Sequence, residues 1–143
     1  MSRPLLCLAA LLLAVFAIFA GACGQTESKE IEDIKWILVS YGEPGNLTTV
    51  IAGTEITATF DSTYSQIRGS AGCNSYSGDY ESNNSDLAIR QIAYTEMACL
   101  NPAGIMEQEQ KYLDVLMDAE SYQVEDETLQ INCDGEILIY TAG

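Results

Sequence analysis

The chain has 143 residues, with 21 acidic and 6 basic side chains, a net charge of −15 at pH 7 and no histidine. This length fits one domain, and the acidic balance argues against binding to nucleic acid or anionic lipid through Lys and Arg. The lack of histidine excludes Ser–His and Cys–His nucleophilic sites and removes the commonest zinc ligand.

The first predicted element is a secretory signal peptide over residues 1–22. Arg3 supplies a short basic end, an apolar run of about 16 residues follows from Leu5 to Ala20, and small residues lead to Cys23. The run is shorter than the roughly 20 residues that span a bilayer, so a retained transmembrane anchor is the weaker interpretation. The residues AGAC resemble a bacterial lipobox. This resemblance implies a mature protein that begins at a lipidated, palmitate-bearing Cys23; an ordinary residue near a conventional cleavage site is the alternative.

A polar segment separates this signal from the folded domain. Residues 23–33 are predicted to form the lipidated N-terminus and a tether, and residues 34–143 the domain. Because export leads to an oxidising compartment, cysteines there are first interpreted as disulfides. Once Cys23 is acylated, one of the three remaining cysteines must stay unpaired or pair between chains. These three are Cys73, Cys99 and Cys133.

Strand patterns dominate the first half of the domain. Residues 35–41 form an apolar, β-rich run before the turn sequence GEPGN. Residues 55–60 alternate polar and apolar side chains, and this period of two predicts a strand with one buried face. Residues 65–82 are expected to form a hairpin-like pair of strands.

Two later strand features also have local signals. The apolar phase of residues 87–94 slips between Ile89 and Ile92, which predicts a β-bulge. Near the end of the chain, two apolar runs flank Asp134-Gly135, which predicts a tight hairpin.

One amphipathic helix interrupts the strands. Asn101 is a good N-cap and Pro102 suits the first helical position, so the helix is expected to start there. Its apolar stripe, about 160° wide, is formed by Ile105, Met106, Tyr112, Leu113, Leu116, Met117 and Ala119. The predicted fold class is therefore α+β: a strand-rich, strongly curved antiparallel β-sheet packed with a single amphipathic helix.

Glu109 lies in the middle of the apolar stripe and is the buried-acid candidate. A carboxylate in such a position must be paired or hydrogen-bonded. The structural expectation is that it reaches past the sheet edge or meets a basic partner such as Arg68. The functional alternative is an acid in a catalytic or binding site.

Three segments of the chain together resemble the META domain, the HslJ-like family of bacterial envelope proteins. They are GSAGCNSYSGDY at 69–80, YTEMACLNP at 94–102 and the helix MEQEQKYLDVL at 106–116. A WxL opening at Trp36 to Leu38 and a closing GxxLxY at Gly135 to Tyr140 extend the similarity over residues 34–141. The family motifs GCNxYxGxY and TxMAC supply the residues to which we assign a structural role: Gly72, Asn74, Tyr76, Gly78, Tyr80, Thr95 and Met97.

The resemblance implies a compact, secreted or lipid-anchored α+β domain. Members are associated with heat shock, resistance to some antibiotics, motility and virulence, and no catalytic residues are generally assigned to them. In this family context a disulfide between Cys73 and Cys99 would tie the helix entrance to the sheet, with a redox site as the alternative. Gly69, Gly72 and Gly78 would allow close packing beneath the helix or a bulge.

No motif in the chain specifies an activity, and we expect no cofactor, no metal and no nucleic acid partner. The expected function is that of an extracytoplasmic, membrane-tethered, non-catalytic binding module of the cell envelope, related to stress response. Its expected partners are the membrane, through the lipid anchor, and an envelope protein. A carboxylate-dependent enzyme that uses Glu109 and a purely structural spacer lipoprotein are the alternatives. A cleft with Glu109 and a second acid would favour the enzyme, and an exposed apolar patch would favour binding.

Overall fold

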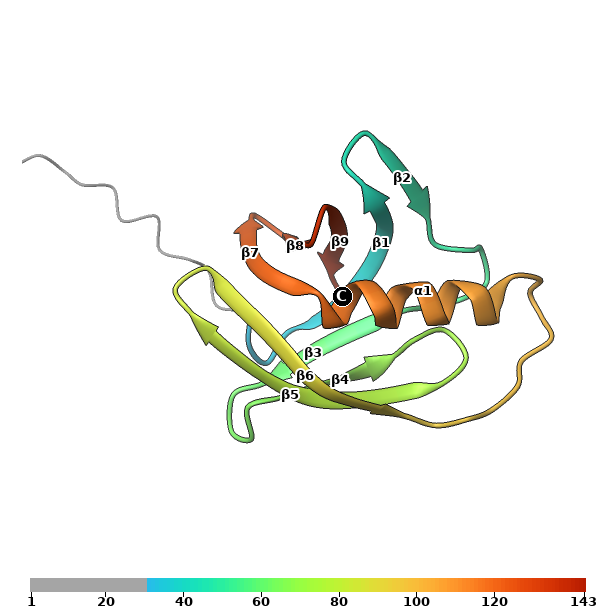
Figure 1. Cartoon of the computed structure of the whole chain (residues 1–143), viewed down its shortest axis with the longest axis horizontal. Coiled ribbons are helices and arrows are strands. Elements are labelled where there is room, and N and C mark those ends of the chain that lie inside the picture. Colours follow the sequence, from blue (N-terminus) through green and yellow to red (C-terminus); the bar gives the residue numbers. More distant parts are fainter. Residues whose placement is uncertain (1–30) are drawn as a thin grey trace, which may run out of the picture.

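Strands dominate residues 31–143, which are the part of the chain that the computed structural model describes. The predicted signal peptide, the lipidation site Cys23 and most of the tether lie outside the described residues. The elements, in chain order (Figure 1), are β1 (Lys35–Glu43), β2 (Asn46–Thr49), β3 (Thr57–Asp61), β4 (Gln66–Ser70), β5 (Ser75–Asn83), β6 (Asp86–Tyr94), α1 (Ile105–Met117), β7 (Ala119–Glu125), β8 (Thr128–Cys133) and β9 (Glu136–Ala142).

The sheet closes on itself and forms a barrel. Its strand order is β2-β1-β3-β4-β5-β6-β7-β8-β9, and β1 also pairs with β9. All pairings between these strands are antiparallel. One edge of β1 pairs with β9, while the other edge pairs first with β3 and then with β2. The predicted curved sheet is thus a closed barrel of eight strands, with β2 as an additional strand on β1.

The helix lies across the weakest seam of this barrel. β6 and β7 share a single register pair, Asp86 with Ser121. The chain between these strands forms α1, which contacts β6, β8 and β9 (Figure 1). The residues that precede β7 form α1, so they cannot extend the ladder along the rest of β6.

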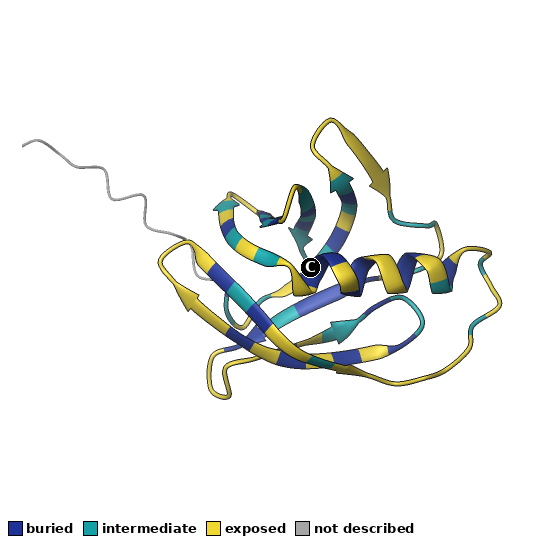
Figure 2. Ribbon diagram, viewed as in Figure 1, coloured by how far each residue is buried: buried dark blue, intermediate teal, exposed yellow. Residues whose placement is uncertain are grey.

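Alternating burial along the strands fills the barrel with a packed core (Figure 2). Every barrel strand contributes to the core: Trp36, Phe60, Ile67, Tyr76, Tyr80, Leu87, Ile89, Tyr122, Leu129, Ile131, Leu138 and Tyr140 are all buried. Phe60 and Tyr80 meet edge to face, with ring centroids 5.1 Å apart. The helix adds Tyr112, Leu113 and Leu116. The helix therefore packs against the core with residues of the apolar face that the periodicity predicts.

The predicted start of the helix is wrong by about one turn. α1 begins at Ile105, and Gly104 is its N-cap residue, with φ of 84° and no side-chain cap. Pro102 lies in a turn before the helix, and its carbonyl accepts the Ile105 N–H at 3.3 Å. The left-handed conformation of Gly104 redirects the chain into the helix, and glycine adopts it without steric cost.

The helix also ends earlier than its predicted apolar stripe. Met117 is 47 % exposed, and Ala119 already belongs to β7. This strand is not predicted from the sequence. Tyr122 and Val124 alternate towards the core in β7. Their period of two covers only three residues, with Glu120 and Glu125 outside it, so the pattern is too short to predict a strand.

The bulge in β6 is where the sequence predicts it. The β5–β6 register shifts between Ser77 and Asp79, and Gln91 has a φ of 55°. Gly78 faces this irregularity, and a Cβ there would lie 2.9 Å from the Arg90 carbonyl oxygen. Gly69 serves a different close approach, because its Cβ would lie 1.9 Å from the carbonyl oxygen of Thr57. That contact is with β3 and not with the helix.

Packing begins within the segment predicted as a tether. Ile31 is buried, and its carbonyl accepts the Trp36 indole N–H at 2.9 Å. Glu32 forms a bridge with Phe60. The packed part of the chain thus includes residues ahead of Ile34, the first residue of the predicted domain.

Candidate functional site

The buried carboxylate of Glu109 binds the loop between β4 and β5. Its Oε2 accepts the backbone N–H groups of Cys73 at 3.1 Å and Asn74 at 2.6 Å. Its Oε1 accepts the Asn74 side-chain amide at 2.6 Å. The prediction that Arg68 is its partner is wrong, because Arg68 forms an ion pair with Asp61, with Nη2 and Oδ2 3.0 Å apart. Backbone N–H groups of the loop satisfy the carboxylate instead, because the loop turns inward after Gly72, whose φ is 115°.

Asn74 connects this carboxylate to the segment that follows β6. Its side-chain amide also donates to the Met97 carbonyl at 3.1 Å. Its Oδ1 accepts the Thr95 hydroxyl at 2.8 Å and the Met97 N–H at 2.7 Å. The side chain thereby makes two donor and two acceptor hydrogen bonds, which is its full capacity. We refer to Cys73, Asn74, Thr95, Met97 and Glu109 as the Glu109–Asn74 network.

The disulfide joins the same two segments covalently. Cys73 and Cys99 are bonded, with their Cα atoms 6.0 Å apart. Cys133, whose state the sequence left open, is a free and buried thiol in β8. Burial raises the pKa of Cys133 to about 12, with further contributions from Asp118, Glu120 and Glu136. The Cys133 thiol therefore stays protonated near neutral pH, which makes it a poor nucleophile.

Three tyrosines form a hydrogen-bonded chain inside the barrel. Tyr140 donates to Tyr112 at 3.2 Å, the hydroxyls of Tyr112 and Tyr76 are 2.7 Å apart, and Tyr76 donates to the Thr57 carbonyl at 2.9 Å. Burial raises the pKa of all three well above 10.0. Tyr76, a residue of the family motif, is thus the link between this chain and the backbone of β3. Tyr80 reaches the N-terminal segment and donates to Glu32 at 2.7 Å.

Sequence reasoning missed a second buried polar side chain on the helix. Gln108 is 2 % exposed; it accepts the Ile51 N–H at 2.7 Å and donates to the Thr54 hydroxyl at 3.0 Å. Its position between Ile105 and Tyr112 on the apolar stripe could have identified it. Consecutive helix residues thus hold different loops: Gln108 the one between β2 and β3, and Glu109 the one between β4 and β5.

The segment held by the Glu109–Asn74 network exposes several apolar side chains. Met97 is 55 % exposed and Leu100 is 86 % exposed, although Asn74 holds the backbone of Met97 and the disulfide holds Cys99, next to Leu100. Tyr94, at the end of β6, is 46 % exposed. The motif residue Met97 therefore presents its side chain to solvent while its backbone is anchored.

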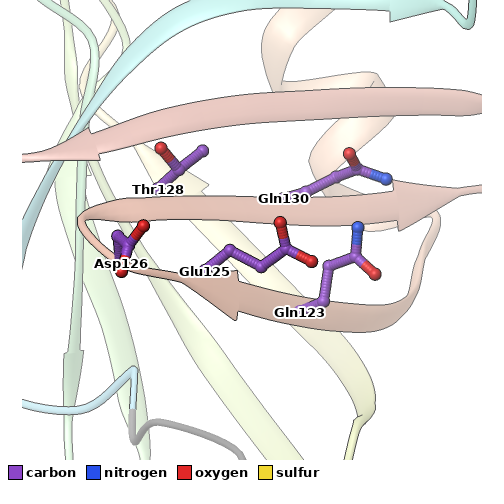
Figure 3. A pocket seen from close by; sticks show the side chains of 5 residues that line it. All are labelled: Gln123, Glu125, Asp126, Thr128 and Gln130. Atoms are coloured by element: carbon purple, nitrogen blue, oxygen red, sulfur yellow. The ribbon is translucent and has the colours of Figure 1, made fainter.

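The surface of the described residues has shallow depressions. Five polar side chains line one of about 250 Å³ on the β7–β8 hairpin (Figure 3): Gln123, Glu125, Asp126, Thr128 and Gln130. Another, of about 540 Å³, is lined by residues that include Glu32, Tyr64 and Asp79. Glu109 lines neither of them.

Residues 31–143 contain no group of three or more His, Cys, Asp or Glu side chains placed to hold a metal ion. In the same part of the chain, no helix is long and apolar enough to cross a membrane.

Solved structures share this fold. An NMR structure of a protein from Burkholderia xenovorans is 27 % identical, with a TM-score of 0.66, and the match covers 79 % of this chain and 83 % of that one. A second NMR structure is 20 % identical, with a TM-score of 0.59 over 78 % of this chain and 90 % of the other. A crystal structure of a duf4847 family protein from Bacteroides vulgatus is 13 % identical, with a TM-score of 0.56 over 78 % and 93 %. The last two similarities show the fold alone.

No curated protein matches the chain. The META domain matches residues 29–142, which is most of the sequence and includes both the barrel and the helix. The chain therefore belongs to the META domain family.

Proposed function

We propose that this chain is an exported META domain protein, tethered to a membrane by a lipid on Cys23, and that it acts by binding an envelope protein. The apolar run from Leu5 to Ala20 and the AGAC sequence support export and lipidation. The binding role is non-catalytic in this proposal, and we relate it to stress of the cell envelope.

The Cys73–Cys99 disulfide is the observation that carries the proposal. A structural disulfide is typical of proteins that fold in an oxidising compartment, and it is rare in the cytosol. The same bond, together with Asn74, fixes the segment that exposes Met97 and Leu100. Prior ordering of a binding segment reduces the entropy that is lost on association, so such a segment is suited to bind a partner.

The position and charge of the segment favour a protein partner. In Figure 1 the described chain begins on the left, while residues 95–104 run along the opposite end. A tether at the N-terminus would therefore be attached at the end of the domain opposite this segment. Glu96, next to Met97 in the sequence, is exposed and adds a negative charge to this segment. The complementary surface is an apolar groove with Lys or Arg at its rim.

The alternative of an enzyme that uses Glu109 lacks a specific observation in its favour. Both oxygens of this carboxylate accept hydrogen bonds from the β4–β5 loop. The carboxylate thus acts as an acceptor that holds a loop, at a position 3 % exposed. We therefore favour the binding role.

Photo-crosslinking in intact cells tests the binding role. A photoreactive amino acid replaces Leu100 in the full chain, and captured proteins are identified by mass spectrometry. A matched chain carries the same amino acid at Ser77, which is exposed on β5. We expect one reproducible partner from position 100 that is absent from position 77 and is lost in a Met97→Ser background. Identical captures from both positions would reject this binding segment.

A second experiment tests the anchor separately. We expect the full chain to partition into the detergent phase and its N-terminal peptide to carry acyl chains on Cys23. A Cys23→Ala chain should lose both properties. Acylation that is undetectable by mass spectrometry of the wild-type peptide would contradict lipidation without affecting the binding role.

A further inference from the structure

Three neighbouring strands of the barrel have an outer side without charged residues. β8 carries no charged residue, β9 carries only Glu136, and β1 carries charges only at its two end residues. Glu136 alternates with the buried Leu138 and Tyr140, so it lies on the inner side, where it forms an ion pair with Lys111 of α1. We call the outer side of β8, β9 and β1 the neutral wall, and its central side chains are Gln130, Asn132, Ile137, Ile139, Ile37 and Ser40.

Aliphatic side chains follow the middle of the neutral wall. Ile139 of β9 lies between Gln130 of β8 and Ser40 of β1 in the register of the sheet. Ile137 lies two positions before it on the same side, and both isoleucines are half-buried. Val39, at the bulge of β1, is 45 % exposed. A partner of this wall therefore has to offer apolar surface, and it needs no countercharge there.

A depression of about 250 Å³ borders the neutral wall on the β7–β8 hairpin (Figure 3). Glu125 lies opposite Thr128, and Gln123 lies opposite Gln130, the residue beside Ile139. The depression thus places a carboxylate next to amide and hydroxyl groups, at the border of an aliphatic surface. The carboxylate can accept a hydrogen bond from an ammonium group, while the Gln123 amide and the Thr128 hydroxyl can donate to a phosphate.

The charge of the chain selects among lipids. An anionic headgroup is attracted by Lys and Arg side chains, but every basic residue between Ile31 and Gly143 is already in a salt bridge: Lys35, Arg68, Arg90 and Lys111. The net charge of −15 would repel such a headgroup. A zwitterionic headgroup adds no net charge, and its ammonium group offers a donor to Glu125.

The proposed lipid anchor keeps the domain beside a membrane. Cys23 and Ile31 are eight positions apart, so the anchored residue lies within about 28 Å of Ile31 even when the chain between them is fully extended. Ile31 is held at the start of β1, because its carbonyl accepts the Trp36 indole N–H at 2.9 Å. The next residue of β1, Ile37, belongs to the neutral wall. A tether this short raises the effective concentration of lipid at the wall, so weak contacts suffice.

We propose that the neutral wall lies on a membrane of zwitterionic phospholipid, with the ammonium group of one headgroup at Glu125. Carboxylates lose hydration when they approach a lipid surface, which is costly. Glu32 and Asp33, at the end where the tether enters, therefore oppose an end-on approach, whereas the neutral wall does not. Met97 and Leu100 follow β6, outside the wall, and remain accessible to a partner. This inference rests on the lipid anchor of the proposed function.

Photo-crosslinking to lipid tests the orientation. The full chain is inserted into vesicles of equal parts phosphatidylethanolamine and phosphatidylcholine, with a diazirine amino acid in place of Ile139. A matched chain carries it at Ser77, on an outward position of β5. We expect about fivefold more phospholipid adduct from position 139, measured by mass spectrometry. Equal adducts from both positions, or adducts with a second copy of the chain in place of lipid, would overturn the proposal.

The anchor can be supplied chemically, so this test does not depend on natural acylation. A chain that carries no lipid is coupled through the Cys23 thiol to a maleimide lipid in the same vesicles. Cys73 and Cys99 are bonded and Cys133 is buried, so they do not compete, and Cys7→Ser removes the remaining thiol. A Cys23 without acyl chains would contradict the anchor of the proposed function. Equal lipid adducts from both positions of the coupled chain would contradict the neutral wall alone.

A substitution on the hairpin tests the headgroup contact. In the same vesicles, the adducts from position 139 should contain about threefold more phosphatidylethanolamine than phosphatidylcholine, because a primary ammonium donates hydrogen bonds to a carboxylate and a quaternary one does not. Glu125→Gln should abolish this preference. Glu127→Gln, at an exposed acid of the same hairpin that does not line the depression, should keep it. A preference that is absent from the wild-type chain, or that persists in Glu125→Gln, would show that the headgroup does not meet Glu125.

Discussion

α1 holds the β4–β5 loop (residues 71–74) directly, but it holds the β1–β2 arm (residues 40–49) only through the chain that follows the arm. A disulfide and three hydrogen bonds to Glu109 fasten the loop. The arm is exposed along β2, and Gln108 holds only the chain that follows it, through Ile51. Buried polar groups specify one conformation because each unmade hydrogen bond is costly. The domain thus fixes the β4–β5 loop against its helix and leaves the edge strand β2 exposed.

The largest expected effect comes from Asn74→Asp. The substitution keeps the shape of the side chain but places a second carboxylate against Glu109 and removes the donor to Met97. An uncompensated buried charge costs about 3–5 kcal/mol, so we expect that loss in the free energy of unfolding in urea. Asn84→Asp, at an exposed turn position with φ of 56°, is the matched control and should change little. Similar values for the two variants would mean that the loop is not fixed by its buried amide.

Removal of the disulfide should cause the second-largest loss in the free energy of unfolding. Cys73→Ser/Cys99→Ser opens a covalent link between residues separated by 26 positions. We expect a loss of about 2–4 kcal/mol in the free energy of unfolding, measured against the oxidised chain. Reduction of the wild-type chain should give the same loss, because Cys133 is buried and unpaired. The rate of amide hydrogen exchange in β2 should not change. Faster exchange there would show that the loop and the arm open together.

Glu109→Gln should have an intermediate effect. One oxygen can still accept the backbone N–H groups of Cys73 and Asn74, but the new amide group faces the donating side chain of Asn74. Two facing donors leave a buried hydrogen bond unmade, at a cost of about 1–3 kcal/mol in the free energy of unfolding. Urea unfolding measures it. A change under about 0.5 kcal/mol would contradict the observed role of the carboxylate.

Gln108→Met should have the smallest and most local effect. Methionine has a similar length but cannot accept the Ile51 N–H or donate to Thr54. We expect a loss of about 1 kcal/mol in the free energy of unfolding. Amide exchange should become faster at Ile51 and stay unchanged at Asn74, as measured by NMR. Faster exchange at both sites would show that the loop and the arm open together.

The candidate site could be predicted only in part. The resemblance supplied the Cys73–Cys99 bridge and marked Asn74, and the helical periodicity marked Glu109 as a misplaced acid. The partner of Glu109 could not be found this way, because it belongs to a loop 35 residues earlier in the chain. Gln108 went unnoticed, since an amide on an apolar stripe gives a weaker signal than a carboxylate.

The local elements could be predicted from the sequence alone: the alternating strands, the bulge in β6, the turn at Asp134-Gly135 and the inward face of the helix. These depend on side chains within a few positions of one another, so a one-dimensional pattern records them. Three features depend on the tertiary structure: the closure of the barrel through β1 and β9, the start of α1 at Ile105 and the strand at Ala119–Glu125. Each of these depends on which distant backbone lies alongside, and that is fixed when the core packs and the buried polar groups find their partners.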